Sequence, residues 1–222
     1  MLKTLLIALA LTSLLAAQEQ GRQKIQTTST QRLDFPPGGA LHLKKSAGEL
    51  TVEGWDQPAV EITAAKSTRY FFGLNERDKA SKELDRVQIT AERRGDEILV
   101  TTAARHCTSV DVDYRIRAPY SARLIVEHGN GEVHVLNVTG DSRITVGKGG
   151  ITMDLPEGSY AIDARSSIGG VVSDFAGAEK RVRLTGHRFS GEPGGSAHNL
   201  YLRAGFGDIL LIKVPKGLGP AQ

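Results

Sequence analysis

A seven-residue pattern built around glycine recurs along the chain and limits the folds that are open to it. The pattern begins with Ser or Gly, has Gly third, Glu, Gly or Asp fourth, and apolar or small residues fifth and seventh. The copies are Gly129–Val135, Gly147–Met153, Ser167–Ser173 and Gly205–Leu211, with an outlying copy at Ser46–Val52. A period near twenty residues that holds two short strands is typical of a solenoid. We therefore predict an all-β chain that winds as a single-stranded parallel, β-helix-like β-solenoid, with coils of about 18–20 residues.

The third-position glycines are expected to form the corners of these coils. They are Gly48, Gly131, Gly149, Gly169 and Gly207. The last four are spaced by 18, 20 and 38 residues, so one copy is missing midway between Gly169 and Gly207. A corner often needs a positive φ, and coils stacked about 4.8 Å apart leave little room for a Cβ. We interpret the five residues as structural turn glycines.

Alternation of apolar and polar residues predicts two strands for each coil. Val133 and Val135 after one corner point to one face while His134 points to the other, and Ile144 and Val146 alternate in the same way before the next corner. With 222 residues, 25 of them Gly, and only 5% aromatic residues, the core is expected to consist of Val, Ile, Leu and Ala rather than large rings.

Four segments are expected along the chain. Residues 1–17 combine Lys3, an apolar run and a small-residue end, as in a cleaved secretory signal peptide. An N-terminal segment, 18–31, precedes the solenoid domain, 32–214, and residues 215–222 form a C-terminal tail. The location that follows is exported: periplasmic, or extracellular at the cell surface. An uncleaved signal anchor stays open as the alternative; after cleavage no membrane span is expected.

Two stretches interrupt the repeat. A helix is expected near 74–86, where Asn75 could cap a helical pattern that ends near Leu84 and Val87. The missing copy falls on the Gly- and Pro-rich stretch 189–195, which is expected to be a loop. A loop on a rigid scaffold can serve recognition, but such insertions in solenoids are more often tolerated excursions.

The motifs of common enzymes are absent from the sequence. It contains no G-x-S-x-G, H-E-x-x-H, C-x-x-C or P-loop pattern. Cys107 is the single cysteine and is interpreted as a packed residue, and His128 with His134 is weak evidence for a metal site. Asp111 and Asp113 share a strand face, as polar residues of an exposed sheet do, and glycosidase carboxylates need a cleft. We expect no catalytic residues, no metal and no cofactor.

Charged residues form two outward rows when the strands before the corners are stacked at twenty-residue spacing. One row holds Arg143, Asp163, Arg183 and Tyr201, and the next holds Thr145, Arg165, Thr185 and Arg203. One interpretation is an ion-pair ladder in which Asp163 neutralises Arg143 and Arg183. The other is a basic strip that binds carboxylates or sulfates of an acidic polymer. The candidate binding residues are Arg143, Arg165, Arg183, Arg203 and Tyr201.

Three further motifs are similar to those of a known bacterial family. They are Phe35-Pro-Pro-Gly-Gly39, the run from Ser46 to Asp56 that reads SAGELTVEGWD, and Asp113-Tyr-Arg-Ile-Arg-Ala-Pro119. Together with the Gly-x-Gly strands they resemble the exported putative-adhesin domain of unknown function, from about Arg32 to Val214. The resemblance implies a parallel β-solenoid and a role in the envelope or at the surface, and it supplies no catalytic residues.

The function expected from the sequence is that of a non-catalytic, adhesin-like scaffold in the cell envelope. Its partner would be an acidic glycan, a cell-surface polymer or an envelope protein. The alternative is a β-helical enzyme acting on acidic polysaccharide. The net charge of +3 is spread among nearly as many acids as bases, so no nucleic-acid partner is expected. The oligomeric state is left open.

Overall fold

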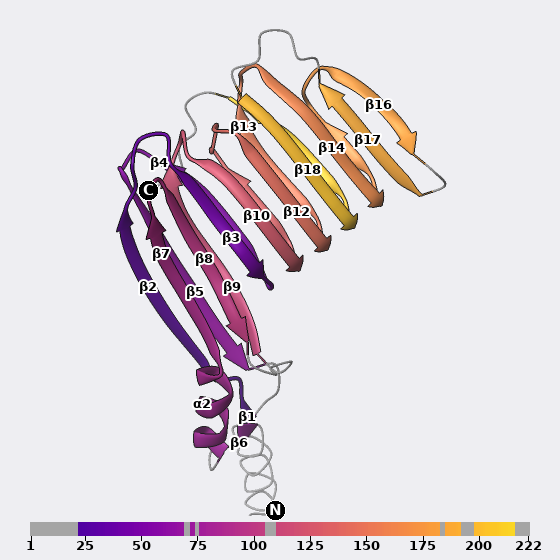
Figure 1. Cartoon of the computed structure of the whole chain (residues 1–222). Coiled ribbons are helices and arrows are strands. Elements are labelled where there is room, and N and C mark those ends of the chain that lie inside the picture. Colours follow the sequence, from indigo (N-terminus) through magenta and orange to yellow (C-terminus); the bar gives the residue numbers. More distant parts are fainter. Residues whose placement is uncertain are drawn as a thin grey trace, which may run out of the picture. The chain divides into compact units, whose positions relative to one another are not determined.

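The computed structural model describes residues 22–68, 72–73, 76–104, 110–182, 185–191 and 198–215 (Figure 1). The chain divides into two compact units. The smaller contains residues 1–27, 66–87 and 104–111, and the larger contains 28–65, 88–103 and 112–222. The predicted signal peptide, Cys107, Arg183 and most of the expected tail lie outside the described residues.

Two sheets form the larger unit. The nine-stranded sheet has the spatial order β16 (Gly177–Val182), β17 (Gly186–Gly191), β14 (Tyr160–Ile168), β18 (His198–Phe206), β12 (Ser142–Lys148), β10 (Arg123–Asn130), β3 (Ala40–Ser46), β8 (Glu97–Ala104) and β7 (Val87–Arg94). The eight-stranded sheet has the order β15 (Val171–Ser173), β19 (Ile209–Val214), β13 (Ile151–Pro156), β11 (Val133–Leu136), β4 (Leu50–Trp55), β9 (Val110–Pro119), β5 (Ala59–Thr68) and β2 (Gln26–Asp34).

The prediction of a single-stranded parallel β-solenoid is wrong. The fold is all-β, but its two sheets are mixed and contain antiparallel as well as parallel strands. β17 pairs antiparallel with both β14 and β16. The chain also does not stack in sequence order, because β18 lies between β12 and β14 (Figure 1). In the other sheet, β19 lies between β13 and β15.

The repeat misled the prediction for a physical reason. Each copy provides one strand for each sheet, with the same alternation and the same corner, so any copy can pair in register with any other. Ile144 of β12, for example, is the register partner of both Val126 in β10 and Leu202 in β18. The pattern therefore specifies the register between neighbours, while the order of the neighbours depends on the loops.

The core lies between the inward faces of the two sheets. Leu41, Leu124, Ile144 and Leu202 come from the nine-stranded sheet, and each is at most 1% exposed. Val52, Val133, Ile151 and Ile209 come from the eight-stranded sheet and are fully buried. The buried side chains are aliphatic for the most part, which agrees with the composition.

The corners are lines of stacked glycines. Gly48, Gly131, Gly149, Gly207 and Gly169 follow one another in space and have φ values of 102°, 123°, 130°, 137° and 141°. A Cβ added to Gly149 would lie 2.0 Å from the carbonyl oxygen of Gly131, and one added to Gly207 would lie 2.2 Å from that of Gly149. Glycine is required here both by the backbone angle and by the approach of the neighbouring corner.

The fourth position of the repeat has a separate role at each corner. Glu132 accepts a hydrogen bond at Oε2 from the backbone N–H of Gly150, at 2.8 Å, and Asp208 accepts one at Oδ1 from Gly170, at 2.7 Å. An acid on one corner thus fixes a glycine of the adjacent corner. In these two pairs of neighbouring corners, the acid of one copy is matched by Gly in the other.

The smaller unit contains helix α2 (Arg77–Asp85) and an antiparallel pair, β1 (Arg22–Gln23) with β6 (Phe72–Gly73). The helix lies inside the segment 74–86 for which a helix was expected, and Ala80 and Leu84 are its buried residues. Lys66 Nζ donates hydrogen bonds to the carbonyl oxygens of Leu84 and Val87. None of the helices within the described ranges has the length and apolar character needed to cross a membrane.

The stretch expected as a loop at 189–195 is in part a strand. Phe189, Ser190 and Gly191 belong to β17, and the side chain of Phe189 is only 6% exposed. Residues 192–195 lie outside the described ranges. Phe189 and Gly191 alternate with the exposed Arg188 and Ser190, so this strand completes one end of the core instead of forming an excursion.

Candidate functional site

The outer face of the nine-stranded sheet brings together several charged side chains in register. One row runs from Arg143 through Tyr201 and Asp163 to Ser190, on strands β12, β18, β14 and β17. The next row runs from Thr145 through Arg203, Arg165 and Arg188 to Lys180, on β12, β18, β14, β17 and β16. We call its last four residues, Arg203, Arg165, Arg188 and Lys180, the basic row.

The basic row is costly to the sheet, because like charges directly opposite each other on adjacent strands are destabilising. Asp163 offsets part of this cost. Its Oδ2 lies 2.6 Å from an Nη of Arg203, and its Oδ1 lies 3.2 Å from Nε of Arg188. Arg203 also donates hydrogen bonds to the carbonyl oxygens of Asp163 and Leu202, at 2.7 and 2.8 Å. One carboxylate therefore serves two of the four cations.

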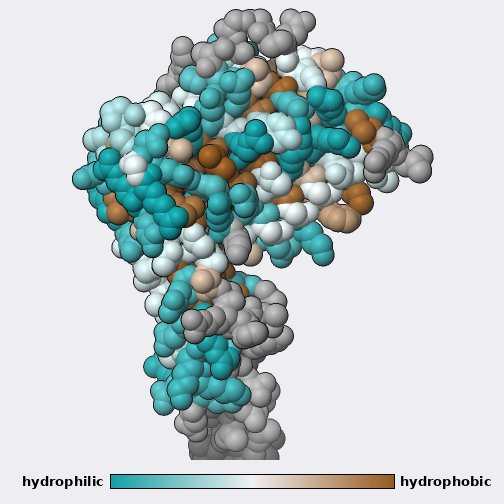
Figure 2. Space-filling model, viewed as in Figure 1, coloured by the Kyte–Doolittle hydropathy of each residue, from teal (hydrophilic) through white to brown (hydrophobic). Residues whose placement is uncertain are grey.

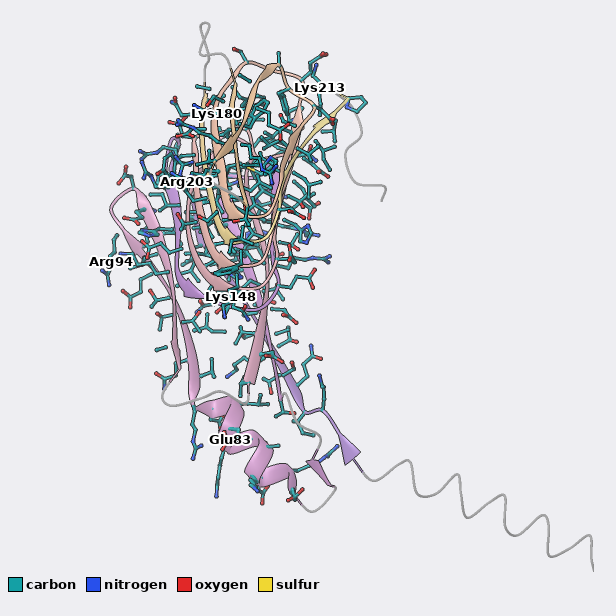
Figure 3. The ribbon with its side chains drawn as sticks, turned by 90° about the vertical axis from the view of Figure 1, so that its right-hand side faces the viewer. Glu83, Arg94, Lys148, Lys180, Arg203 and Lys213 are labelled. Carbon is teal, nitrogen blue, oxygen red and sulfur yellow. The ribbon has the colours of Figure 1, made fainter. Side chains whose placement is uncertain are left out.

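The other two cations have no such partner. Among the described residues, no carboxylate lies within ion-pairing distance of Arg165 or of Lys180. Lys180 is exposed and Arg165 is partly exposed. In Figure 3 the labelled Lys180 and Arg203 extend from the same side of the sheets, opposite to Lys213. Figure 2 views the side from which they extend, where hydrophilic residues are interspersed with hydrophobic ones.

Tyr201 lies beside the basic row and contacts two guanidinium groups. The Cζ atom of Arg203 is 3.6 Å from the centroid of the tyrosine ring, and that of Arg143 is 4.5 Å from it. Cation–π contacts of this kind hold a guanidinium without neutralising its charge. Within the described part of the chain, Arg143 has no carboxylate partner either, so its charge remains available on an exposed side chain.

A small hollow opens next to these residues on the same outer face. Its volume is about 260 Å³. It is lined by Arg123, Leu124, Ile125, Asp141, Ser142, Arg143, Asn199 and Tyr201, which belong to β10, β12, β18 and the turn before β12. Asp141 accepts hydrogen bonds at Oδ1 from the backbone N–H of Asn199, at 2.7 Å, and from its side-chain amide, at 3.4 Å.

Four of the five candidate binding residues predicted from the sequence lie together on this face: Arg143, Arg165, Arg203 and Tyr201. Arg183 lies outside the described residues. The predicted order of the rows is wrong, because Tyr201 separates Arg143 from Asp163. Asp163 consequently pairs with Arg203 and Arg188, and the expected pairing with Arg143 does not form.

Sequence reasoning missed Arg188 and Lys180. Both lie on the antiparallel strands β17 and β16, outside the parallel repeat, so a count of twenty residues could not reach them. The local signal was the alternation from His187 to Ser190, in which Arg188 and Ser190 are exposed and Phe189 is buried.

The histidine pair considered as a weak metal candidate does not form a site. His128 is only 3% exposed and points into the core from β10, whereas His134 lies on β11 in the other sheet. The Nε2 atom of His128 is 3.0 Å from the carbonyl oxygen of Gly48, and its Nδ1 atom is 2.8 Å from Oγ of Ser46. Burial lowers the pKa of His128, against smaller opposing effects from the carbonyl oxygens of Gly48 and Asn130 and from Glu132.

The remaining candidates from the sequence have structural partners. Asp113 accepts a hydrogen bond from the backbone N–H of Glu49, at 3.0 Å, and so belongs to the series of corner contacts. Within the described residues, no group of three or more His, Cys, Asp or Glu side chains is placed to hold a metal ion.

Comparisons with known proteins give little further information. No family model matches the chain, and no curated protein matches it. One similar solved structure is the crystal structure of a putative cell adhesion protein from Clostridium sporogenes ATCC 15579. The TM-score is 0.46 and the identity is 15%, over 85% of this chain and 100% of the other. At these values the likeness gives no basis for transferring a function, and the resemblance to the adhesin domain stays a resemblance.

Proposed function

We propose that the protein is a non-catalytic binding scaffold whose basic row holds an extended acidic polymer. The observation that carries the proposal is the alignment of four cations on four adjacent strands, with the carboxylate of Asp163 in the neighbouring row. Neighbouring strands are spaced by about 4.8 Å, so the row offers a positive charge at each step across the sheet. A polymer with repeated anionic groups can contact several of these charges at once.

Stability alone does not account for this arrangement. An exposed ion pair contributes about 0 to 1 kcal/mol, and adjacent like charges oppose folding by similar amounts. Arg165 and Lys180, which have no carboxylate partner among the described residues, add repulsion and no compensating pair. Bound anions would remove this repulsion, and guanidinium groups suit them because they bind carboxylates and sulfates through two hydrogen bonds.

The cellular setting that we propose is the envelope or the cell surface. The signal-like residues 1–17 support export, and an acidic glycan or a surface polymer is the type of ligand that an exported adhesin-like scaffold would meet there.

The proposal is tested by replacing the two unpartnered cations, in the double variant Arg165→Gln with Lys180→Gln. We expect weaker retention on an immobilised acidic polysaccharide and a smaller salt dependence of binding. On the counterion-release scale of nucleic acids, each lost contact lowers the slope of log K against log salt by roughly 0.7 to 0.9, so two would lower it by about 1.4 to 1.8. Column retention over a salt gradient measures both effects.

The matched control is Lys213→Gln, which removes one positive charge on the opposite side of the sheets (Figure 3). It should retain the wild-type salt dependence. Equal retention of the double variant and the wild-type protein, with both folded by circular dichroism, would refute the proposal. Release of unsaturated sugars during the same incubation would instead favour an enzyme.

A further inference from the structure

The hollow beside Arg143 contains a combination of groups that simple charge attraction does not explain. Arg143 offers an exposed guanidinium, but Asp141 places a carboxylate on the same small surface. A carboxylate repels every anionic group that approaches it. A surface selected only to attract polyanions would be stronger without Asp141, so this residue calls for a ligand that also brings hydrogen-bond donors.

The contacts of Asp141 leave one of its carboxylate oxygens able to accept hydrogen bonds from such donors. Its Oδ1 is occupied by the backbone N–H and the side-chain amide of Asn199. No described residue donates a hydrogen bond to its Oδ2. An ionised carboxylate accepts hydrogen bonds and cannot donate them, so the complementary groups are hydroxyls or amines. Asn199 is exposed, and its amide is held in place by the same carboxylate.

The remaining lining fits a sugar ring. Ile125, the register neighbour of Arg143 on β10, is an apolar surface next to the polar groups, while the ring of Tyr201 on the other side of Arg143 is already contacted by the two guanidinium groups. The volume of about 260 Å³ lies below the roughly 300–1,000 Å³ of pockets for drug-sized ligands, so it suits a single small unit. A sugar offers a C–H face for the apolar surface and hydroxyls for Asp141.

The guanidinium of Arg143, next to the apolar surface and Asp141, requires a further group on that sugar. Arg143 has no carboxylate partner among the described residues, and its guanidinium presents two parallel N–H groups that match a carboxylate. A sugar that carries a carboxylate therefore provides a partner for Arg143, for Asp141 and for the apolar floor at the same time. Inorganic polyphosphate, which has neither hydroxyls nor a C–H face along its chain, provides one only for Arg143.

We propose that this hollow binds one uronic-acid unit of the polymer, so that the ligand of the basic row is a polyuronate. The inference rests on the proposed function, because the neighbouring units of the same chain would contact Arg203 and Arg165. It adds a chemical distinction, because the site would recognise the sugar hydroxyls beside the carboxylate and not only the negative charge. Polyphosphate and nucleic acid lack this combination at their backbones.

The substitution Asp141→Asn separates recognition from charge, because it keeps the shape of the side chain and its acceptor oxygen for Asn199 while it removes a negative charge. Binding of oligogalacturonate and of polyphosphate with an equal number of charges is measured by titration calorimetry at fixed ionic strength. We expect the variant to bind oligogalacturonate about tenfold more weakly, because a hydroxyl loses a charged acceptor. Polyphosphate binding should become tighter, because a repulsive charge is gone.

The possible outcomes distinguish the two proposals. Tighter binding of both polymers by Asp141→Asn would overturn the uronate inference and keep the binding scaffold. Tighter binding of polyphosphate than of oligogalacturonate by the wild-type protein would also overturn it. Binding of neither polymer by the wild-type protein would refute the scaffold itself. If Asp141→Asn does not fold, Asn199→Ala takes its place, with weaker binding of oligogalacturonate alone as the expected result.

Discussion

Gly149 shows how tightly a single corner residue is constrained. Its φ is 130°, and a Cβ would lie 2.0 Å from the carbonyl oxygen of Gly131. We expect Gly149→Ala to lower the free energy of unfolding by more than about 3 kcal/mol, because backbone strain at positive φ adds to a clash that only a backbone shift can relieve. Urea unfolding followed by circular dichroism measures the loss.

Gly95 provides the matched control for Gly149. It also has a positive φ, 67°, but nothing lies within 4 Å of a Cβ built there. Gly95→Ala should therefore cost only about 1 to 2 kcal/mol, the strain of the backbone angle alone. Lys148→Ala, at the exposed position before the corner, should change stability by less than about 0.5 kcal/mol. Equal losses at Gly149 and Gly95 would show that the adjacent corner does not limit this position.

His128 links the core to pH through its lowered pKa. The folded state holds fewer protons than the unfolded state once the pH falls below the ordinary value of about 6.5, so stability decreases as the medium becomes acidic. The contribution of this residue has a slope of at most about 1.4 kcal/mol per pH unit, down to the pKa of the folded state. Urea unfolding at pH 7.5 and at pH 5.5 measures the difference.

The side chain of Gln can replace both contacts of His128 without a titrating group. His128→Gln should therefore lose less stability between the two pH values than the wild-type protein does, because an amide can donate to the Gly48 carbonyl and accept from Ser46. His198→Gln, on β18, should keep the wild-type dependence. The same pH dependence in all three proteins would exclude His128 as its source.

At the level of strands, the unusual feature is the position of β19 between β13 and β15. Thr152 and Leu210 are register partners on β13 and β19, and Leu210 is also the partner of Val172 on β15. The pair Thr152→Cys with Leu210→Cys, in a Cys107→Ser background, should form a disulfide on mild oxidation. Cα atoms on adjacent strands are about 4.8 Å apart, within the usual range for a disulfide.

The control pair joins β13 and β15, which follow each other in sequence within their sheet but are not adjacent in space. Thr152→Cys with Val172→Cys spans two strand positions, roughly 9.6 Å, which is too far for a disulfide. It should stay reduced under the same conditions. Mass spectrometry after cysteine alkylation distinguishes the two pairs, and a bond in the second pair alone would restore the sequential order that the repeat suggests.

Taken over the whole molecule, the sequence predicts faces better than it predicts neighbours. The outward direction of Arg143, Tyr201 and Arg203 follows from alternation, which is a local property of a strand. The position of Tyr201 next to Arg143 does not follow, because a segment about 58 residues further along enters between β12 and β14. No local feature of the sequence distinguishes the observed strand order from stacking in sequence order, because every copy has the same corner and register.

The candidate site was likewise predictable only in part. Two members of the basic row, Arg203 and Arg165, lie on strands of the repeat and were predicted as candidates. The other two, Arg188 and Lys180, lie on strands that pair in the opposite direction, and they join the row only through tertiary structure. The hollow was not predicted at all, because Asp141 and Asn199 meet across 58 residues of sequence.

The central position of β18 and β19 also determines the order of events during synthesis. Residues 142–173 leave the ribosome before residues 198–214, yet β12 and β14 do not pair with each other, because each of them pairs with β18. The nascent chain therefore cannot complete its sheets one coil at a time. Until β18 is complete, the edge of β14 must stay open while about 38 more residues are translated, and the edge of β12 while about 58 are. An open edge is a point where another chain can pair.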